Sequence, residues 1–240
     1  MSTQNHIAGK VMIQDKLMSS FEVMEAIKAL RTNVIFSGEE KRSIGLTSCG
    51  ENDGKTTISL NLAAALAMDG KKTVLFDADI RRSVLAKYSE THGRIEGLGQ
   101  YLAGQCAIND ILYATDVPNL YIIFAGTRVA NPAELLGSKR LKGLVAALKN
   151  TFSYVIIDTP PLGRVIDCAI MAPVIDGLLI VVNTEKNSFR AVRAVKAQYE
   201  KANGKILGVV LNKCNFKDKS SYYGRAYGYG YGYGGYGNKY

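Results

Sequence analysis

The chain has 240 residues, of which 47% are hydrophobic, and 30 Lys and Arg against 21 Asp and Glu give a formal net charge of +9. The length fits one α/β domain with appendages, and the apolar fraction excludes a mainly disordered protein. No uninterrupted apolar run of about 18 residues occurs, and the N-terminus lacks an apolar signal core, so we expect a cytoplasmic protein. The positive charge alone leaves nucleic acid, an anionic membrane surface and a phosphorylated ligand open as partners.

The cysteines argue against a structural zinc site or a disulfide framework. They stand far apart, at Cys49, Cys106, Cys168 and Cys214, and no CxxC pair occurs. Only two histidines are present to complete a zinc site. We therefore expect reduced thiols.

The first predicted element is an amphipathic helix at about residues 19–36, within an N-terminal segment that spans residues 1–42. Apolar side chains recur there at helical spacing, in the order Phe21, Met24, Ile27, Leu30 and Val34. Such a stripe faces either the core of its own chain or a partner.

Short Val/Ile/Leu-rich runs then alternate with helical patterns over residues 43–216, which we take as the main domain. This alternation is typical of βαβ units, so the sequence predicts an α/β fold with a mostly parallel sheet and helices on both faces. The predicted strands are Ser43–Ser48, Thr73–Asp77, 120–124, Tyr154–Asp158, Gly177–Asn183 and Ile206–Asn212.

Two of the intervening helices have recognisable ends. One is expected over residues 55–69, closed by Gly70 in a left-handed conformation. Another is expected over residues 132–150, with Asn131 as its N-cap and Pro132 in its first turn, where the missing N–H is tolerated.

The composition changes after the last predicted strand. Residues 222–240 read YYGRAYGYGYGYGGYGNKY and hold eight tyrosines and seven glycines, with no aliphatic side chain larger than alanine. Because such a segment has almost nothing with which to build a core, we expect residues 217–240 to form a disordered tail.

The strongest local signal is the segment 48–57, which reads SCGENDGKTT between a predicted strand and a predicted helix. This is the setting of a P-loop, in which backbone N–H groups hold an anion, Lys55 meets the outer phosphates and the Thr56 hydroxyl ligates Mg²⁺. The first glycine of GxxxxGK[ST] would fall at Cys49, and a strand-to-helix turn with an incidental lysine is the alternative. The residues expected around the nucleotide are Ser48, Asn52, Asp53, Gly54, Lys55, Thr56 and Thr57.

Three aspartates follow predicted strands: Asp77 and Asp79 end the run VLFDAD, and Asp158 ends VIID. Ligands of an open parallel sheet bind at the carboxyl ends of its strands, so these carboxylates can converge on Mg²⁺ and on phosphates held by the P-loop. We expect Asp77 and Asp79 to point to the same side of an extended segment. The alternatives are solvated strand ends or helix caps, but three aspartates together with a P-loop favour a site.

The combination of hhhDxDxR, hhhDxxP and a GK[ST] loop resembles the bacterial tyrosine kinases, P-loop enzymes that control capsule and exopolysaccharide export. The resemblance covers essentially the whole chain. It implies a P-loop NTPase fold, an ATP-dependent protein-tyrosine kinase activity with ATP and Mg²⁺, and a role for Arg81 as the motif arginine. The family's loop commonly carries Pro-Gly-Glu where this chain has Glu51, Asn52 and Asp53.

Two further segments are similar to the family. The run EAIKALR resembles an ExxRxxR oligomerisation motif, which implies an oligomer interface at Glu25, Lys28 and Arg31, with Lys28 where arginine is usual. A solvated helix face with an i,i+3 ion pair is the alternative. The tail resembles an autophosphorylated cluster, which implies phosphorylation at Tyr222, Tyr223, Tyr227, Tyr229, Tyr231, Tyr233, Tyr236 and Tyr240.

The resemblance also implies partners. They are a homo-oligomer (a ring or a dimer), a separate transmembrane activator chain, a phosphotyrosine phosphatase and other protein substrates, with no specific nucleic acid. The activator would recruit the cytoplasmic chain to the inner face of the cell membrane.

The expected mechanism divides the site between phosphate binding and acceptor activation. Lys55 and Mg²⁺, the latter held through Thr56 with Asp79 and Asp158, would neutralise the β- and γ-phosphates, while Asp77 orients or deprotonates the acceptor tyrosine. A Gly-rich coil of about 18 residues reaches roughly 25 Å, so a neighbour's site lies within range, and oligomerisation favours transfer between subunits.

Two other functions stay open from the sequence. A ParA/MinD-like P-loop ATPase is the nearer one, although its KGGxGK[ST] loop has a lysine that would fall at Gly50. A low-complexity nucleic-acid-binding protein is the other, although residues 222–240 have only Arg225 and Lys239 as cations. Asn212 can touch the adenine or form a turn, and Asp167 can sense the γ-phosphate or cap a helix.

Overall fold

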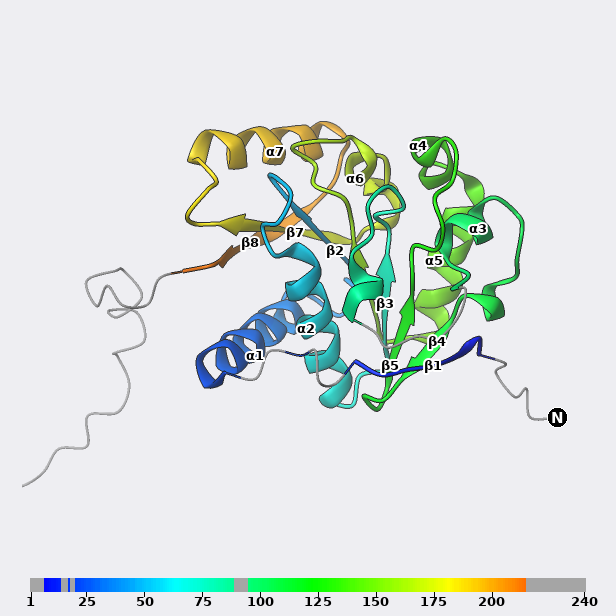
Figure 1. Ribbon diagram of the computed structural model, residues 1–240. Coiled ribbons are helices and arrows are strands. Elements are labelled where there is room, and N and C mark those ends of the chain that lie inside the picture. The colour runs from blue at the N-terminus through cyan, green and yellow to red at the C-terminus, as the bar shows by residue number, and fades with distance from the viewer. Residues whose placement is uncertain (1–6, 14–16, 18–19, 89–94, 215–240) are drawn as a thin grey trace, which may run out of the picture.

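The computed structural model describes residues 7–13, 17, 20–88 and 95–214 (Figure 1). The predicted tail, residues 217–240, lies outside the described residues. Within them, no helix is long and apolar enough to cross a membrane.

The architecture is one eight-stranded sheet with helices on both faces, which confirms the predicted α/β fold class. The strand order is β1-β4-β5-β3-β6-β2-β7-β8, and every neighbouring pair is parallel except β4 and β5. The strands are β1 Gly9–Val11, β2 Ser43–Ser48, β3 Thr73–Asp77, β4 Tyr113–Thr115, β5 Leu120–Ile123, β6 Tyr154–Asp158, β7 Gly177–Asn183 and β8 Ile206–Asn212. The helices are α1 Phe21–Phe36, α2 Lys55–Met68, α3 Leu98–Leu102, α4 Pro132–Leu136, α5 Lys139–Thr151, α6 Asp167–Ile170 and α7 Phe189–Lys201, with 3₁₀ turns at Leu85–Tyr88, Ile108–Asp110 and Ala172–Val174.

Successive residues of the central strands enter opposite cores. Leu75 on β3 packs in the core beneath α1 and α2, whereas Val74 and Phe76 pack in the core beneath α3, α4 and α5. Strands β2, β3, β6 and β7 are buried along their whole length. Burial on both faces explains why these strands read as continuous apolar runs rather than alternating ones.

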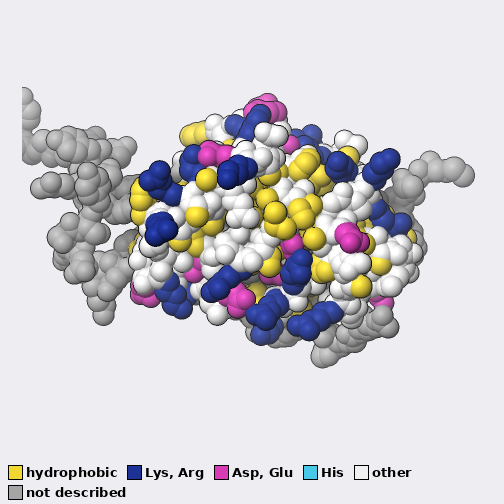
Figure 2. Space-filling view, turned by 90° about the horizontal axis from the view of Figure 1, so that it is seen from above, with side chains coloured by type: hydrophobic (Ala, Val, Ile, Leu, Met, Phe, Trp, Pro, Cys, Tyr) yellow, Lys and Arg dark blue, Asp and Glu magenta, His cyan; other side chains and the backbone are white. Residues whose placement is uncertain are grey.

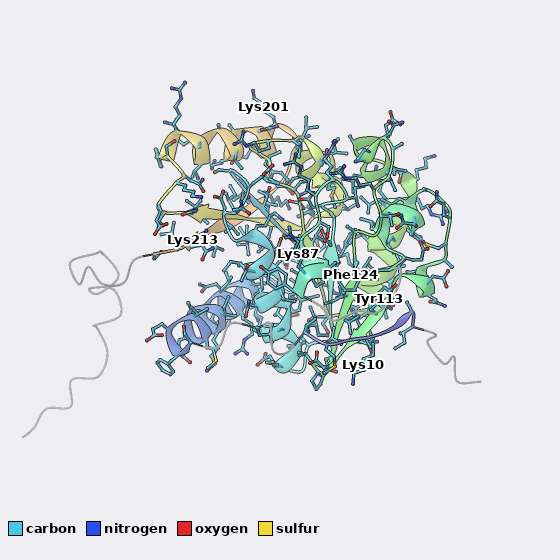
Figure 3. All side chains as sticks on the ribbon, viewed as in Figure 1. Lys10, Lys87, Tyr113, Phe124, Lys201 and Lys213 are labelled. Carbon is cyan, nitrogen blue, oxygen red and sulfur yellow. The ribbon has the colours of Figure 1, made fainter. Side chains whose placement is uncertain are left out.

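The sequence missed the two short strands at one edge of the sheet. Strands β1 and β4 have three residues each, too few for a periodic pattern. Strand β4 is held partly by an edge-to-face contact between Tyr113 and Phe124, whose ring centroids lie 5.4 Å apart (Figure 3).

The helix predicted over residues 132–150 is wrong as a single element. It divides into α4 and α5 because Ser138 accepts a hydrogen bond from the backbone N–H of Leu141 and caps a new helix. Asn131 precedes Pro132 as expected, but it has a φ of 52° and its side chain makes no capping bond. Gly70 has the expected left-handed conformation, with φ 79°.

The stripe of the first helix is divided between core and solvent. In α1, Ile27 and Val34 are buried and Leu30 packs against the same core, whereas Phe21 and Met24 are exposed. The inner part of the stripe therefore faces α2, and its N-terminal part is free of the core.

Candidate active site

The loop between β2 and α2 lies at the carboxyl edge of the sheet, as a P-loop does. Asn52 and Gly54 have positive φ angles of 62° and 92°. Asparagine and glycine are the residues that adopt this left-handed conformation at least cost, which accounts for Asn52 where the family commonly has glycine. A Cβ at Gly54 would lie 2.0 Å from the Nδ2 atom of Asn212, so the loop fits only a glycine there.

Asp53 holds the loop from inside. Its side chain is buried and accepts hydrogen bonds from the backbone N–H of Gly50 at 2.8 Å and from Nδ2 of Asn187 at 3.4 Å. Asn212 donates through Nδ2 to the Asp53 carbonyl oxygen at 2.9 Å. Asn212 thus buttresses the loop and is not among the residues that line the cavity described below.

Asp158 is the centre of a buried cluster of hydrogen-bonded polar side chains. Its Oδ1 atom accepts from Lys55 Nζ at 2.7 Å and from Ser59 Oγ at 3.0 Å, and its Oδ2 atom accepts from Thr56 Oγ1 at 2.6 Å. Burial alone would lower the pKa of Lys55, but the Asp158 carboxylate outweighs it and the pKa of Lys55 lies above its usual value. The lysine therefore stays charged.

Asp77 lies beside this cluster, because it pairs with Asp158 in the register of β3 and β6. Ser83 Oγ donates to its Oδ2 atom, and the backbone N–H of Asp79 donates to Oδ1 at 3.0 Å. Burial first, and then the Asp158 charge, raise the pKa of Asp77 to about 7, against the opposing effects of Ser83 and Lys55. The carboxyl group is thus poised to take up or release a proton near neutrality.

Asp77 and Asp79 differ in exposure, and both carboxylates act on the charge of Lys55. The strand ends at Asp77, and its hydrogen bond from the Asp79 N–H turns the chain, so Asp77 is buried and Asp79 lines the cavity. The Asp79 Oδ1 atom accepts from the backbone N–H of Arg82 at 2.9 Å. Burial is the main cause of a raised pKa at Asp79.

Arg81 is fixed by a carboxylate from another element. It donates through Nε and Nη2 to the two oxygens of Asp167, at 2.5 and 2.9 Å. Asp167 is fully buried at the start of α6. Neither role suggested for Asp167 by the sequence includes this pair, since the partners are 86 positions apart.

A cavity of about 640 Å³ opens over the loop. All the residues predicted to contact the nucleotide line it except Asn212, and Asp79 and Arg81 line it as well. Asp77 and Asp158 are not among the lining residues. The sequence did not identify the other lining residues, Gly50, Glu51, Arg82, Val84, Tyr88, Pro160, Pro161, Arg164, Val165 and Lys213. Among these, Gly50 and Glu51 carried a signal as part of the loop segment 48–57, and the two prolines as part of the hhhDxxP motif.

The donor set fits a Mg²⁺-bound nucleoside triphosphate. The cradle of backbone N–H groups and Lys55 suits phosphate, and Thr56, Asp79 and Asp158 offer the oxygen ligands that Mg²⁺ prefers. No three His, Cys, Asp or Glu side chains in the described residues form a metal site by themselves. Phosphate oxygens and water would therefore complete the coordination.

The residues of the predicted oligomer motif lie apart from this cavity, on α1. Lys28 Nζ and Glu25 Oε1 form an exposed i,i+3 ion pair at 2.7 Å, the geometry of the solvated-face alternative. Arg31 Nη1 lies 3.2 Å from Asp69 Oδ1 at the end of α2 and 3.5 Å from the carbonyl of Ala65. Arg31 thus joins α1 to α2 within the chain, and an interface through Glu25 and Lys28 remains a prediction.

Comparison with known proteins agrees with this geometry. Residues 50–207 match a family described as an AAA domain. Tyrosine-protein kinase CpsD of Streptococcus agalactiae is 40% identical over 203 residues, which are 85% of this chain and 89% of that protein. The corresponding kinase of Streptococcus pneumoniae is 37% identical over 212 residues, 88% of this chain and 93% of that protein.

Solved kinase structures are also similar. The kinase domain of the Escherichia coli tyrosine kinase ETK has a TM-score of 0.79 at 29% identity, with 92% of this chain and 83% of that chain covered. The chimerical protein CapA2B2 has a TM-score of 0.77 at 31% identity, with 87% and 94% covered. The chain belongs to the bacterial tyrosine kinase family.

This membership confirms the resemblance drawn from the three motifs. The septum site-determining protein MinD of Pyrococcus horikoshii, solved with Mg-ADP, is similar at a lower TM-score of 0.62 and 25% identity, with 74% of this chain and 72% of that chain covered. Bacterial tyrosine kinases and the MinD-type ATPases thus share the nucleotide-binding architecture, and this chain lies nearer the kinases.

Proposed function

We propose that this chain is an ATP-dependent protein-tyrosine kinase that phosphorylates the tyrosines of its own C-terminal segment and so regulates capsule or exopolysaccharide export. The observation that carries the proposal is the cluster of Lys55, Thr56 and Asp158, with Asp77 beside it on the neighbouring strand. It joins phosphate-binding groups to a carboxyl group whose pKa is suited to proton transfer.

Phosphate binding would change the hydrogen-bond partners within the cluster. Lys55 and Thr56 both hold Asp158 in the structure. Lys55 can instead donate to phosphate oxygens, and the Thr56 hydroxyl oxygen has lone pairs for a cation. Thr56, Asp79 and Asp158 would hold Mg²⁺, which would supply positive charge to offset that of the phosphates. Asp53 and Asn187 keep the loop in position through this exchange.

Acceptor activation falls to Asp77. A tyrosine hydroxyl has a pKa near 10, so its ionisation at pH 7 costs about 4 kcal/mol. A carboxylate whose pKa is raised to about 7 is a far better proton acceptor for that hydroxyl than one near 3.8. Asp77 does not line the cavity but Asp79 does, so we expect the acceptor tyrosine to enter beside Asp79.

The deciding experiment is intact-mass analysis of the purified chain after incubation with MgATP. We expect several added phosphates in the wild type and none in Lys55→Met. Asp77→Asn should bind ATP as the wild type does yet transfer phosphate about 10²- to 10⁴-fold more slowly. Normal transfer by Asp77→Asn would reject the base assignment.

Transfer between subunits follows from the proposed oligomer. A Lys55→Met subunit has a complete set of tail tyrosines, and a subunit whose tail tyrosines are all phenylalanine has a complete site. Mixed together, they should yield phosphotyrosine on the Lys55→Met chain. An unphosphorylated mixture would show that transfer is strictly internal.

Charge provides the proposed switch. Each phosphotyrosine adds about −1.5 to −2, so about six cancel the net charge of +9. More Lys and Arg than Asp and Glu side chains are visible on the face in Figure 2, a surface suited to an anionic membrane before phosphorylation.

We expect phosphorylation to dissociate the oligomer and weaken recruitment to the inner membrane face by a separate transmembrane activator. Sedimentation before and after MgATP tests this, since an unchanged distribution contradicts it; a phosphotyrosine phosphatase would reset the switch.

A further inference from the structure

A second, smaller cavity of about 230 Å³ adjoins the nucleotide cavity. The two share Asp79, Arg81 and Arg82 in their walls, so they meet at the turn that follows β3. The smaller one is completed by Ile80, Ser83, Ala125, Gly126 and Arg128. It lies below the roughly 300 Å³ of typical small-molecule pockets, so it fits a phosphoryl group but not a second nucleotide.

Three arginines line this small volume. Arg128 is exposed and makes no hydrogen bond or ion pair with any residue that the structure describes. Arg81 uses Nε and Nη2 on Asp167, and its Nη1 donors make no hydrogen bond to a residue that the structure describes. Among the described residues, the Arg82 guanidinium is paired only through Nη1, with the exposed Glu51 at 3.0 Å.

The walls therefore hold three positive charges against one carboxylate, that of Asp79. Asp167 orients Arg81 from behind without entering the cavity wall. Clusters of arginine with spare donors recognise phosphate oxygens by charge-assisted and bidentate hydrogen bonds. The nucleotide phosphates are already provided for at Lys55, so this second cavity has donors for a different anion.

The sequence of the C-terminal segment indicates which anion. Asp218 is the only acidic residue among residues 215–240, so an unmodified tail has little negative charge with which to bind an arginine cluster. The proposed reaction changes that, because each phosphotyrosine brings about −1.5 to −2 of charge. Tyrosines alternate with glycines from Tyr227 to Tyr233, and alternate residues of an extended chain lie about 6.6 Å apart on one face.

We propose that Arg81, Arg82 and Arg128 form a subsite for a phosphotyrosine of a partly phosphorylated tail, which places a neighbouring tyrosine at the catalytic cavity. The inference rests on the proposed kinase function and deepens it. Each transfer is the proposed one: the γ-phosphoryl group passes from ATP to the tyrosine oxygen, the hydroxyl proton goes to Asp77 and ADP leaves. The first phosphate therefore promotes the second, and doubly and triply phosphorylated chains accumulate early.

The test follows the number of phosphates per full-length chain over time by intact mass, at limiting extents of reaction. In the wild type, multiply phosphorylated chains should exceed a random distribution at equal total phosphate. Arg128→Ala should remove that excess. The matched control is Arg193→Ala on α7, an exposed arginine that stacks on Phe189 away from both cavities, and it should keep the excess.

The outcomes separate the two ideas. If the wild type forms no phosphotyrosine, the proposed kinase function itself is wrong. Phosphorylation with a random distribution in the wild type, or an excess that Arg128→Ala preserves, overturns only the subsite.

A binding measurement gives an independent readout. Synthetic Gly-Tyr-Gly-phosphotyrosine-Gly should bind full-length Lys55→Met at least about tenfold more tightly than the unphosphorylated peptide, and Arg128→Ala in that background should remove the difference. Equal binding of the two peptides would overturn the proposal, as would a preference that survives Arg128→Ala.

Discussion

Two lysine–carboxylate pairs on neighbouring helices have the same length and opposite surroundings. Lys55 at the start of α2 lies 2.7 Å from Asp158, with side chains 8% and 1% exposed. Lys28 on α1 lies 2.7 Å from Glu25, with side chains 55% and 50% exposed. Distance alone therefore does not rank these interactions.

The difference lies in what each pair displaces. The buried pair has lost its water and is completed by hydroxyl groups of Thr56 and Ser59, so each partner depends on the other. The exposed pair exchanges freely with water and is screened by salt. Burial makes the first pair a functional element that cannot be altered singly, whereas the second is a local helix interaction.

The largest effect is expected from Lys55→Met. It removes the phosphate-binding charge and leaves the Asp158 carboxylate buried with hydroxyl partners only. We expect phosphotransfer to be lost and the free energy of unfolding to fall by about 3 kcal/mol. Lys28→Met is the matched control, because the same change in the exposed pair should stay within about 0.5 kcal/mol in denaturant titration. Equal losses in both variants would show that burial does not distinguish the pairs.

A smaller but still large effect is expected from Gly54→Ala in the same loop. The left-handed φ of 92° costs an alanine about 1–2 kcal/mol, and the new Cβ meets Asn212. Unfolding by denaturant should show this loss together with weaker nucleotide binding. Gly143→Ala in α5 is the control: nothing lies within 4 Å of its added Cβ, and it should stabilise the chain by about 0.5–1 kcal/mol.

The buried site should also leave a mark on the pH dependence of stability. The pKa of Asp77 is raised from 3.8 to about 7, so the folded state binds a proton more tightly than the unfolded state. The resulting stability is complete below about pH 4 and is lost as the pH rises through about 7. Asp77→Asn cannot ionise, so it should gain thermal stability relative to the wild type between pH 5 and pH 8. A gap that is constant over this range would contradict the raised pKa.

The smallest effect is expected from Lys28→Ala. Loss of an exposed i,i+3 pair should cost about 0.2–0.5 kcal/mol at low salt and nothing measurable near 1 M salt. Denaturant titration of the wild type and the variant at both salt concentrations measures it. A salt-independent cost above about 1 kcal/mol would mean that α1 uses this lysine in another contact.

The sequence predicted the parts of the molecule where one residue pattern has one structural solution. The four central strands β2, β3, β6 and β7 have the predicted bounds, because runs buried on both faces are continuous and end at charged or turn residues. The break between α4 and α5 was missed because a serine inside an apolar helical pattern gives no sign of whether it will cap.

The candidate site was predictable where motifs carry its residues, and not where the fold alone brings partners together. The loop residues, Asp79 and Arg81 reach the cavity as expected. The pair between Arg81 and Asp167 and the bracing of Asp53 by Asn187 join positions 86 and 134 residues apart, which no local pattern encodes. The burial of Asp77 behind the cavity was not predictable either, because it follows from the turn that its own carboxylate makes with the Asp79 N–H after the strand.

One contact at the end of β8 links the nucleotide loop to whatever follows in the chain. Lys213, labelled in Figure 3, has a φ of 57° and donates through Nζ to the carbonyl oxygen of Asn52 at 3.0 Å. The stem of the C-terminal segment is therefore moored to the same loop that must grip ATP. Because linkage is reciprocal, any change that nucleotide binding makes in the strength of this contact would be matched by an equal change in nucleotide affinity when a partner alters the contact.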